Sequence, residues 1–126
     1  MKKQVVSTTK AAEPKAPYSQ GIVYGDLLFV SGSGPIDPNT QEFVRGSLED
    51  EARLTLNNVK AIVGEAGFSM ENALKVTVFL TDFDDFSRFN EVYKEFFPQP
   101  YPARSAIQAG KLGFGIKCEV EAIIGR

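Results

Sequence analysis

Hydrophobic and polar residues repeat along this chain with two different periods, one typical of helices and the other of strands. Between residues 47 and 67 the apolar side chains fall on one helical face, formed by Ala52, Leu56, Val59, Val63 and Ala66. Ser47-Leu-Glu-Asp50 resembles a capping box in which Asp50 stands for the preferred Glu or Gln. Gly67 suits the end of the segment. The pattern therefore predicts a helix here.

The segment that follows predicts a strand and a second helix. Lys75-Val-Thr-Val-Phe-Leu80 alternates and is rich in β-branched residues, which is typical of a strand. Acidic residues at 82, 84 and 85 then provide start signals for a helix that we expect to end near Phe97, before Pro98. Its apolar face consists of Phe86, Phe89, Val92, Tyr93, Phe96 and Phe97. Asn90 is carried close to this face.

The two ends of the chain supply the remaining strands. Gly21–Tyr24 and Leu27–Ser31 flank a tight turn and predict a hairpin, whereas residues 8–17 predict an ordered loop or arm. Residues 31–38, rich in Gly and Pro, predict a loop. Two closing strands are expected at about 104–109 and 116–124.

This order of elements predicts one α+β domain over residues 1–126, with two helices on one face of a sheet. The other face then needs a cover, because several apolar residues exceed what two helices hide: Phe29, Ile36, Phe43, Phe79, Ile107 and Ile123. Self-association would provide that cover. Loops are the alternative.

Composition excludes several classes of function. The net charge of −2 offers no basic stripe for a phosphate backbone, so nucleic acid is not an expected partner. No apolar run is long enough for a membrane span or a signal peptide, so we expect a cytoplasmic protein. The chain has no histidine and one cysteine, which removes a Ser-His-Asp triad, a Cys-His pair and multi-cysteine metal sites. Any chemistry must come from carboxylates, Arg, Lys, Tyr, hydroxyls, backbone groups and water.

Arg104 is the most informative candidate residue. It follows Pro100 and Pro102 and opens a predicted strand, where an unpaired charge is costly. Its guanidinium matches a carboxylate or phosphate through two parallel hydrogen bonds. Glu121, in the last strand, provides a competing explanation, since adjacent antiparallel strands could bring the two into an ion pair. Both interpretations, ligand and structural partner, remain open from these residues.

Each of the other polar candidates has a structural and a ligand-binding interpretation. Tyr18 could anchor a loop or line a site, and Ser31-Gly32 could present backbone N–H groups to an anion or end a strand. Asn90 could bond to a nearby loop or contact a ligand. Cys118 alternates with Val120 and Ala122 and is expected to be an inert core residue.

Taken together, these segments resemble the YjgF/Rid family of reactive-intermediate deaminases, also described as L-PSP proteins. The similarity covers nearly the whole chain through six motifs in order: Pro17-Tyr18-Ser-Gln20-Gly21, Phe29-Val-Ser-Gly32, Val76-Thr-Val-Phe-Leu-Thr-Asp82, Phe89-Asn90-Glu-Val-Tyr93, Pro102-Ala-Arg-Ser105 and Glu119-Val-Glu-Ala122.

The resemblance implies a chorismate-mutase-like α+β fold with a mixed six-stranded sheet, assembled as a homotrimer around a central barrel with sites between subunits. It implies hydrolysis of 2-imino acids, such as 2-aminoacrylate and 2-iminobutanoate, to 2-keto acids and ammonia without cofactor or metal. The family's ligand arginine maps onto Arg104 and its water-handling glutamate onto Glu121. Its other site residues map onto Tyr18, Ser31, Gly32 and Asn90.

The chain departs from the family pattern at two positions. Ala106 stands where many members have a cysteine, and Ser33 replaces a glutamine after the Ser-Gly pair. The hydrolytic mechanism does not need that cysteine, so Ala106 affects the shape of the pocket floor and leaves the preferred imine open. The alternatives are a ribonuclease or translation inhibitor, as some relatives are described, and a trimer that binds 2-keto acids without turnover.

Overall fold

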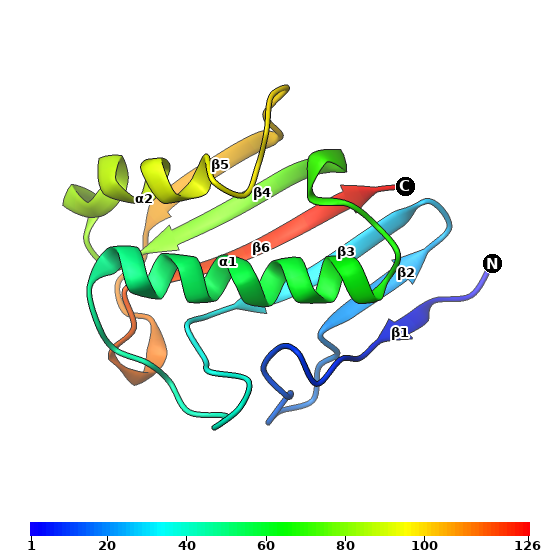
Figure 1. Cartoon of the computed structure of the whole chain (residues 1–126), viewed down its shortest axis with the longest axis horizontal. Helices are drawn as coiled ribbons and strands as arrows, with labels where there is room; N and C mark the ends of the chain where they lie inside the picture. The colour runs from blue at the N-terminus through cyan, green and yellow to red at the C-terminus, as the bar shows by residue number, and fades with distance from the viewer.

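Six strands and two helices build the chain, and the computed structural model describes all of residues 1–126. In order they are β1 (Gln4–Val6), β2 (Gly21–Tyr24), β3 (Leu27–Ser33), α1 (Leu48–Glu65), β4 (Ala73–Leu80), α2 (Phe86–Tyr93), β5 (Ala103–Gln108) and β6 (Cys118–Gly125). Both helices cover the same face of the sheet (Figure 1). The predicted α+β architecture is confirmed. No helix combines the length and the apolar character needed to cross a membrane.

The sheet is mixed, and its strands lie in the order β1-β2-β3-β6-β4-β5. Neighbouring strands are antiparallel except β4 and β5, which are parallel. A parallel pair needs a crossover connection, and α2 supplies it by passing over the sheet between the two strands. As a result β4 separates β5 from β6, although β5 and β6 follow one another in the sequence.

Helix α1 forms as its sequence predicts. The Ser47 side chain caps it by accepting a hydrogen bond of 3.1 Å from the backbone N–H of Asp50. Gly67 follows the helix with a φ of +78°, a conformation that glycine adopts without strain. Four of the five predicted core positions are buried, namely Ala52, Leu56, Val59 and Val63. The sequence did not reveal that Glu51, Thr55 and Asn58 are buried on the same helix.

Helix α2 is shorter than predicted. A short 3-10 turn over Phe83–Asp85 precedes it, and its regular hydrogen bonding ends at Tyr93. Irregular turns continue the chain to Phe97, whose N–H still donates to the carbonyl of Tyr93. Phe97 is fully buried in the core. The core therefore requires an apolar residue at this position, so the apolar pattern in the sequence continues past the end of the regular helix.

The core lies between the helices and one face of the sheet, whereas the opposite face, here called the open face, is partly bare. Phe29 and Ile107 on the open face are 42% and 48% exposed. Phe79 and Ile123 beside them are half-buried. The prediction that Ile36 and Phe43 share this face is wrong, because both lie in the loop before α1 and pair with each other.

Candidate functional site

Arg104 lies on β5 with its side chain toward α2, on the helix-covered face of the sheet. Its central carbon is 4.7 Å from the centre of the Tyr93 ring and 5.5 Å from that of Phe86. Such contacts attract a cation to the face of an aromatic ring. None of the seven ion pairs in the chain includes Arg104. Its charge is therefore held by aromatic faces and stays free to bind an anion.

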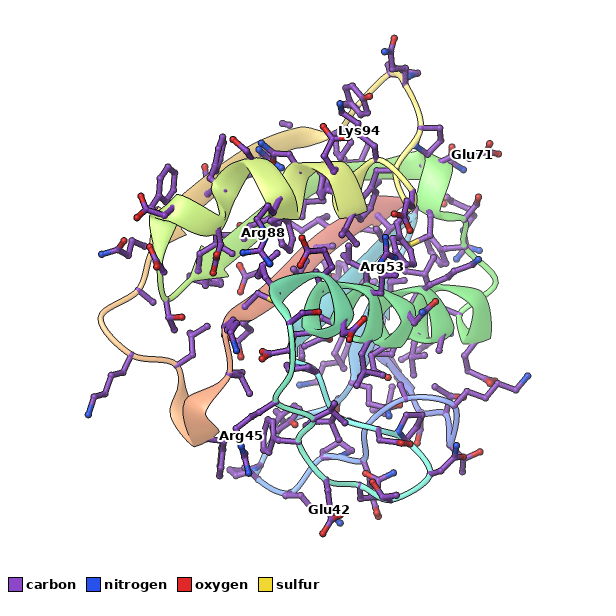
Figure 2. All side chains as sticks on the ribbon, turned by 60° about the vertical axis from the view of Figure 1, so that its left-hand side comes forward. Glu42, Arg45, Arg53, Glu71, Arg88 and Lys94 are labelled. Atoms are coloured by element: carbon purple, nitrogen blue, oxygen red, sulfur yellow. The ribbon has the colours of Figure 1, made fainter.

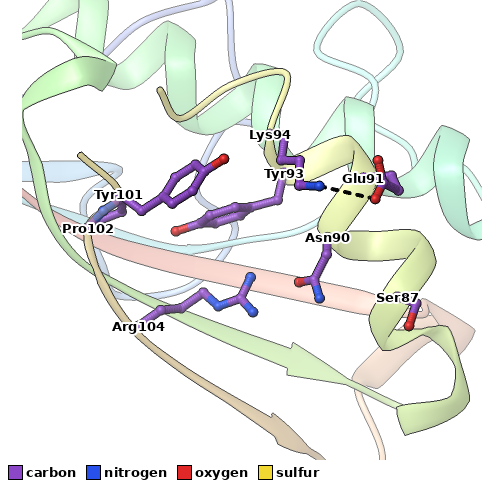
Figure 3. Close-up of a pocket in the computed structure, with 8 residues that line it drawn as sticks. All are labelled: Ser87, Asn90, Glu91, Tyr93, Lys94, Tyr101, Pro102 and Arg104. Atoms are coloured by element: carbon purple, nitrogen blue, oxygen red, sulfur yellow. Dashed lines mark hydrogen bonds and ion pairs between the residues drawn. The ribbon is translucent and has the colours of Figure 1, made fainter. Parts of the chain in front are cut away.

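A pocket of about 410 Å³ opens beside this guanidinium, between α2 and β5. Its lining comprises Ser87, Asn90, Glu91, Tyr93, Lys94, Tyr101, Pro102 and Arg104. The structure thus brings together Asn90 and Arg104, two of the residues expected from the sequence. Figure 3 shows the Asn90 amide and the Arg104 guanidinium pointing toward one another across the pocket.

Two polar atoms at this pocket are buried without a hydrogen-bond partner in the chain. They are Oδ1 of Asn90 and the hydroxyl oxygen of Tyr93. Burial raises the pKa of Tyr93 to about 12, although the positive charge of Arg104 acts in the opposite direction. The hydroxyl therefore remains protonated at neutral pH. Tyr93 was predicted only as a core residue, and its position three residues after Asn90 was the available signal.

Ala106 lies two residues after Arg104 on the same face of β5. It is half-buried and packs against the hydrophobic core. Its partner in the parallel register is Val78, which is fully buried. Ala106 is not among the residues that line the pocket, so its small side chain affects the support of β5 more than the pocket wall.

A second group of predicted residues gathers near β3. The Ser31 hydroxyl donates to the backbone oxygen of Ser19 at 2.5 Å, and the Ser31 N–H donates to that of Gln20 at 3.0 Å. These bonds fasten the segment around Tyr18 to the strand. Tyr18 itself is 48% exposed. This arrangement leaves its ring free to contact a ligand or another chain.

Gly32 allows a carboxylate to approach the strand closely. A Cβ atom at this position would lie 3.2 Å from the carboxyl carbon of Glu119, a distance tighter than ordinary van der Waals contact. The register between β3 and β6 shifts between Val30 and Ser33, as at a β-bulge. The structure therefore places Glu119, a residue that was not predicted to have a role, beside Gly32.

The carboxyl pKa of Glu119 is also raised above its ordinary value. Burial raises its carboxyl pKa, and the negative charge of Glu121 on the same strand raises it further. Glu121, which was the predicted residue, is exposed and lies opposite Thr77 on the open face. A half-buried carboxyl group with a raised pKa can both accept and return a proton. The alternation of residues 119 and 121 was visible in the sequence, but the contact with Gly32 was not.

The two groups of residues lie far apart in one chain. Arg104 faces the helices, whereas Glu119 and Glu121 face the opposite side of the sheet. Strands β3 and β5 are also separated by β6 and β4, which corresponds to about 14 Å at the usual spacing between strands. The expectation that Glu121 approaches Arg104 within the sheet is wrong, because β4 lies between their strands. A structural ion pair between them is absent from the chain.

The side chains contain no cluster of three or more residues that could hold a metal ion. What they do offer are a guanidinium with free hydrogen-bonding edges, a pocket of small-molecule size and a carboxyl group suited to proton transfer. The guanidinium can bind a carboxylate in bidentate fashion. Chemistry on a small carboxylic acid with the help of water is within the reach of these groups.

Comparison with known proteins gives consistent matches over the full length. The family model described as Endoribonuclease L-PSP matches residues 8–125. A protein named "Putative reactive intermediate deaminase TdcF" from Escherichia coli strain K12 is 44% identical over 127 residues, covering 98% of each chain. A "2-iminobutanoate/2-iminopropanoate deaminase" from Dermatophagoides farinae is 38% identical over 122 residues, covering 97% of this chain and 95% of the relative.

Among solved structures, E. coli TdcF with bound serine superimposes with a TM-score of 0.92 at 44% identity, covering 98% of both chains. The family model, the sequence relatives and the shared fold agree, and the chain belongs to the YjgF/Rid (L-PSP) family.

Proposed function

We propose that this protein hydrolyses short 2-imino acids to 2-keto acids and ammonia. The observation that carries the proposal is the unpaired Arg104 guanidinium at the wall of a pocket of about 410 Å³. The other charged residues of the lining, Glu91 and Lys94, pair with each other. One unpaired cation therefore faces the pocket, which suits a ligand with one carboxylate. The names of two relatives, a reactive intermediate deaminase and a 2-iminobutanoate/2-iminopropanoate deaminase, support the same chemistry. TdcF with bound serine supports a ligand of amino-acid size.

The proposed reaction needs only water and these side chains. Arg104 binds the substrate carboxylate through two hydrogen bonds and so fixes the adjacent imine carbon. A carboxylate removes a proton from a water molecule as that water attacks the imine carbon, and the C=N double bond becomes a single bond. The carboxylic acid then gives this proton to the nitrogen. As the C–N bond breaks and ammonia leaves, the carboxylate takes the proton of the new hydroxyl group, and the keto group forms. A protonated imine is already electrophilic, so no nucleophilic side chain is required.

Two glutamates compete for the role of proton carrier. The family pattern pointed to Glu121, which remains a prediction. Glu119 has better support from its surroundings, since it lies beside Gly32 and its pKa is raised by burial. Tyr18, Ser31 and Gly32 would then shape the part of the site that surrounds the water molecule.

We further propose that the working site forms between two chains of a homotrimer. Arg104 with Asn90 makes one half-site, and Gly32 with Glu119 makes the other, on the opposite side of the sheet. A single chain keeps these halves apart, so only a neighbouring subunit could complete the site. The partly bare open face, with Phe29 and Ile107 exposed, supports association of several copies through their sheets.

Ribonuclease activity is the main alternative, because the matching family model carries the description Endoribonuclease. The chain has a net charge of −2 and no histidine. It thus lacks the overall charge that attracts a phosphate backbone and the most frequent base of ribonuclease chemistry. A trimer that binds 2-keto acids without turnover is the other alternative, and it would use the same Arg104 contact.

A coupled assay tests the proposal. A dehydratase that acts on serine or threonine generates the imine in place, and the formation of keto acid is followed with and without this protein. We expect the protein to speed keto-acid formation and the Arg104→Ala variant to lose this effect by at least about a hundredfold, the loss expected when a positioning contact is removed. Full activity in a folded Arg104→Ala variant would contradict the carboxylate role. Keto-acid binding without any gain in rate would favour the binding alternative.

A further inference from the structure

Tyr93 combines two properties that its role as a core residue does not explain. Its side chain is only 5% exposed, yet its hydroxyl oxygen has no hydrogen-bond partner in the chain. Asn90, one helical turn earlier on α2, has an unpaired buried Oδ1 atom as well. Buried polar atoms almost always have a hydrogen-bond partner, because an unpaired one loses its hydrogen bonds to water without gaining others. Two such atoms beside one pocket indicate that binding supplies their partner.

The Tyr93 ring is held firmly by its neighbours. It packs 4.6 Å from the Phe97 ring and 6.2 Å from the Phe89 ring, measured between ring centres. The opposite neighbour is the Arg104 guanidinium, with its central carbon 4.7 Å from the ring centre. Tyr93 thus connects the core to the one charged group of the pocket lining that has no ionic partner. Figure 3 shows Tyr93, Asn90 and Arg104 around the same space.

The unpaired atoms match the needs of a guanidinium that binds a carboxylate. A bidentate carboxylate uses only part of the N–H donors of an arginine, and the others need acceptors. Oδ1 of Asn90 and the hydroxyl oxygen of Tyr93 are both unpaired acceptors, and their residues line the same pocket as Arg104. A tyrosine hydroxyl is neutral at pH 7, and burial raises the Tyr93 pKa further, to about 12.

We propose that Tyr93 is a positioning residue for ligand binding: its ring supports the Arg104 guanidinium, and its hydroxyl, together with Oδ1 of Asn90, accepts N–H bonds from that guanidinium when a 2-keto or 2-imino carboxylate is bound. The inference rests on the proposed function, because it requires a carboxylate at Arg104. Without a ligand the guanidinium is held by the rings of Tyr93 and Phe86 alone. Binding then completes the hydrogen bonds of three side chains at once.

The test compares stability and affinity in Tyr93→Phe, which removes the hydroxyl and keeps the ring. The probe is 2-oxobutanoate, titrated into the full-length protein by calorimetry. We expect the affinity to fall roughly tenfold, the effect of losing one hydrogen bond to a charged group. Without ligand, we expect the unfolding temperature to stay equal or rise, because an unpaired buried hydroxyl has been removed.

Tyr24→Phe is the matched control. It removes the same atom from a tyrosine on β2 that is 48% exposed and lies outside the Arg104 pocket. We expect this variant to bind 2-oxobutanoate within about twofold of the unmodified protein, as is usual for exposed positions. Equal affinity in the Tyr93 and Tyr24 variants would overturn the inference. A lower unfolding temperature with unchanged affinity in Tyr93→Phe would also overturn it, since the hydroxyl would then be structural.

Arg104→Ala in the same titration separates this inference from the proposed function. If Arg104→Ala abolishes binding while Tyr93→Phe leaves it unchanged, the carboxylate contact stands and the role of Tyr93 is wrong. If Arg104→Ala binds 2-oxobutanoate as tightly as the unmodified protein, the proposed function fails and the role of Tyr93 fails with it.

Discussion

Arg104 shows how a charged side chain can remain in a folded chain without an ionic partner. Two aromatic rings face its guanidinium, those of Phe86 and Tyr93, the first and last residues of α2. These faces attract the cation but leave its N–H edges unused. A carboxylate neighbour would have used those edges and reduced the affinity for a ligand. The residue is therefore prepared for binding by the absence of a competing ion pair.

The carboxyl groups of β6 allow a pH experiment on the proposed reaction. Glu119 has a raised pKa, caused first by burial and second by the charge of Glu121. If Glu119 takes the proton from water, it must be ionised, so activity falls as the pH drops through this raised pKa. Replacing Glu121 with Gln removes a negative neighbour and lowers the Glu119 pKa. We expect Glu121→Gln to shift the acidic limb of the rate profile to lower pH.

Glu119→Gln is the companion variant in the same pH series. It should abolish most of the activity at every pH, because the amide cannot accept the proton. The reverse pattern, with activity lost in Glu121→Gln and an unchanged profile in Glu119→Gln, would assign the role to Glu121. The two variants differ only in position along β6, so each serves as the other's control.

At the scale of elements, a buried carboxylate fastens three segments together. Glu51 on α1 is fully buried and accepts from the backbone N–H of Lys117 at 2.7 Å and that of Gly46 at 3.2 Å. The Lys117 ammonium group lies 3.1 Å from the same carboxylate and also donates to the Gly46 oxygen at 2.7 Å. Since Lys117 comes immediately before β6, this junction fixes the strand that carries Glu119.

Glu51→Ala is expected to destabilise the fold by about 3 kcal/mol, because it leaves buried N–H groups unpaired and separates a partly buried ion pair. Urea unfolding followed by circular dichroism measures this change. Glu95→Ala is the control, since it breaks the exposed pair between Glu95 and Arg53 that joins the turn after α2 to α1 (Figure 2 labels Arg53). The control should lose much less stability. Equal losses in both variants would show that burial of Glu51 is not what stabilises the junction.

Local sequence patterns predicted most helices and strands, but they did not predict which elements lie next to one another in the fold. The face of α1 and its cap at Ser47 depend on residues close in sequence, and both were predicted correctly. The end of α2 was predicted too late, at Phe97. The regular helix ends at Tyr93, and Phe97 is buried by tertiary packing beyond it. The insertion of β4 between β5 and β6 depends on the crossover, which no local pattern reports.

That crossover also decides which candidate residues can share a site. Alternation correctly grouped Glu119 with Glu121 and Arg104 with Ala106. It could not state which group faces the helices, because the sheet is apolar on both sides: Val76 and Val78 are buried on one face and Phe29 and Ile107 remain exposed on the other. Regular alternation could not predict the contact between Gly32 and Glu119 either, because it lies where the register of β3 shifts.

At the scale of the whole molecule, the proposed function requires two half-sites that one copy cannot combine. Arg104 and Asn90 open on the side of α2, whereas Gly32 and Glu119 meet on β3 and β6, which lie three and two strands away from β5. An assembly in which each chain offers one half to a neighbour uses both, and it buries the open face at the same time. In a closed ring of three copies every subunit would contribute to two sites.

Mixed assemblies test this arrangement directly. Arg104→Ala and Glu119→Gln chains, each inactive alone, are co-expressed with different tags, and assemblies that carry both tags are purified and weighed by light scattering. If every site takes Arg104 from one chain and Glu119 from the next, each mixed trimer contains one intact site, and about a third of the unmodified activity returns. If both residues act within one chain, no activity returns, because neither chain holds both. Pairing Arg104→Ala with a chain that carries both substitutions provides the control, since no intact site can form; activity there would show that Arg104 is dispensable.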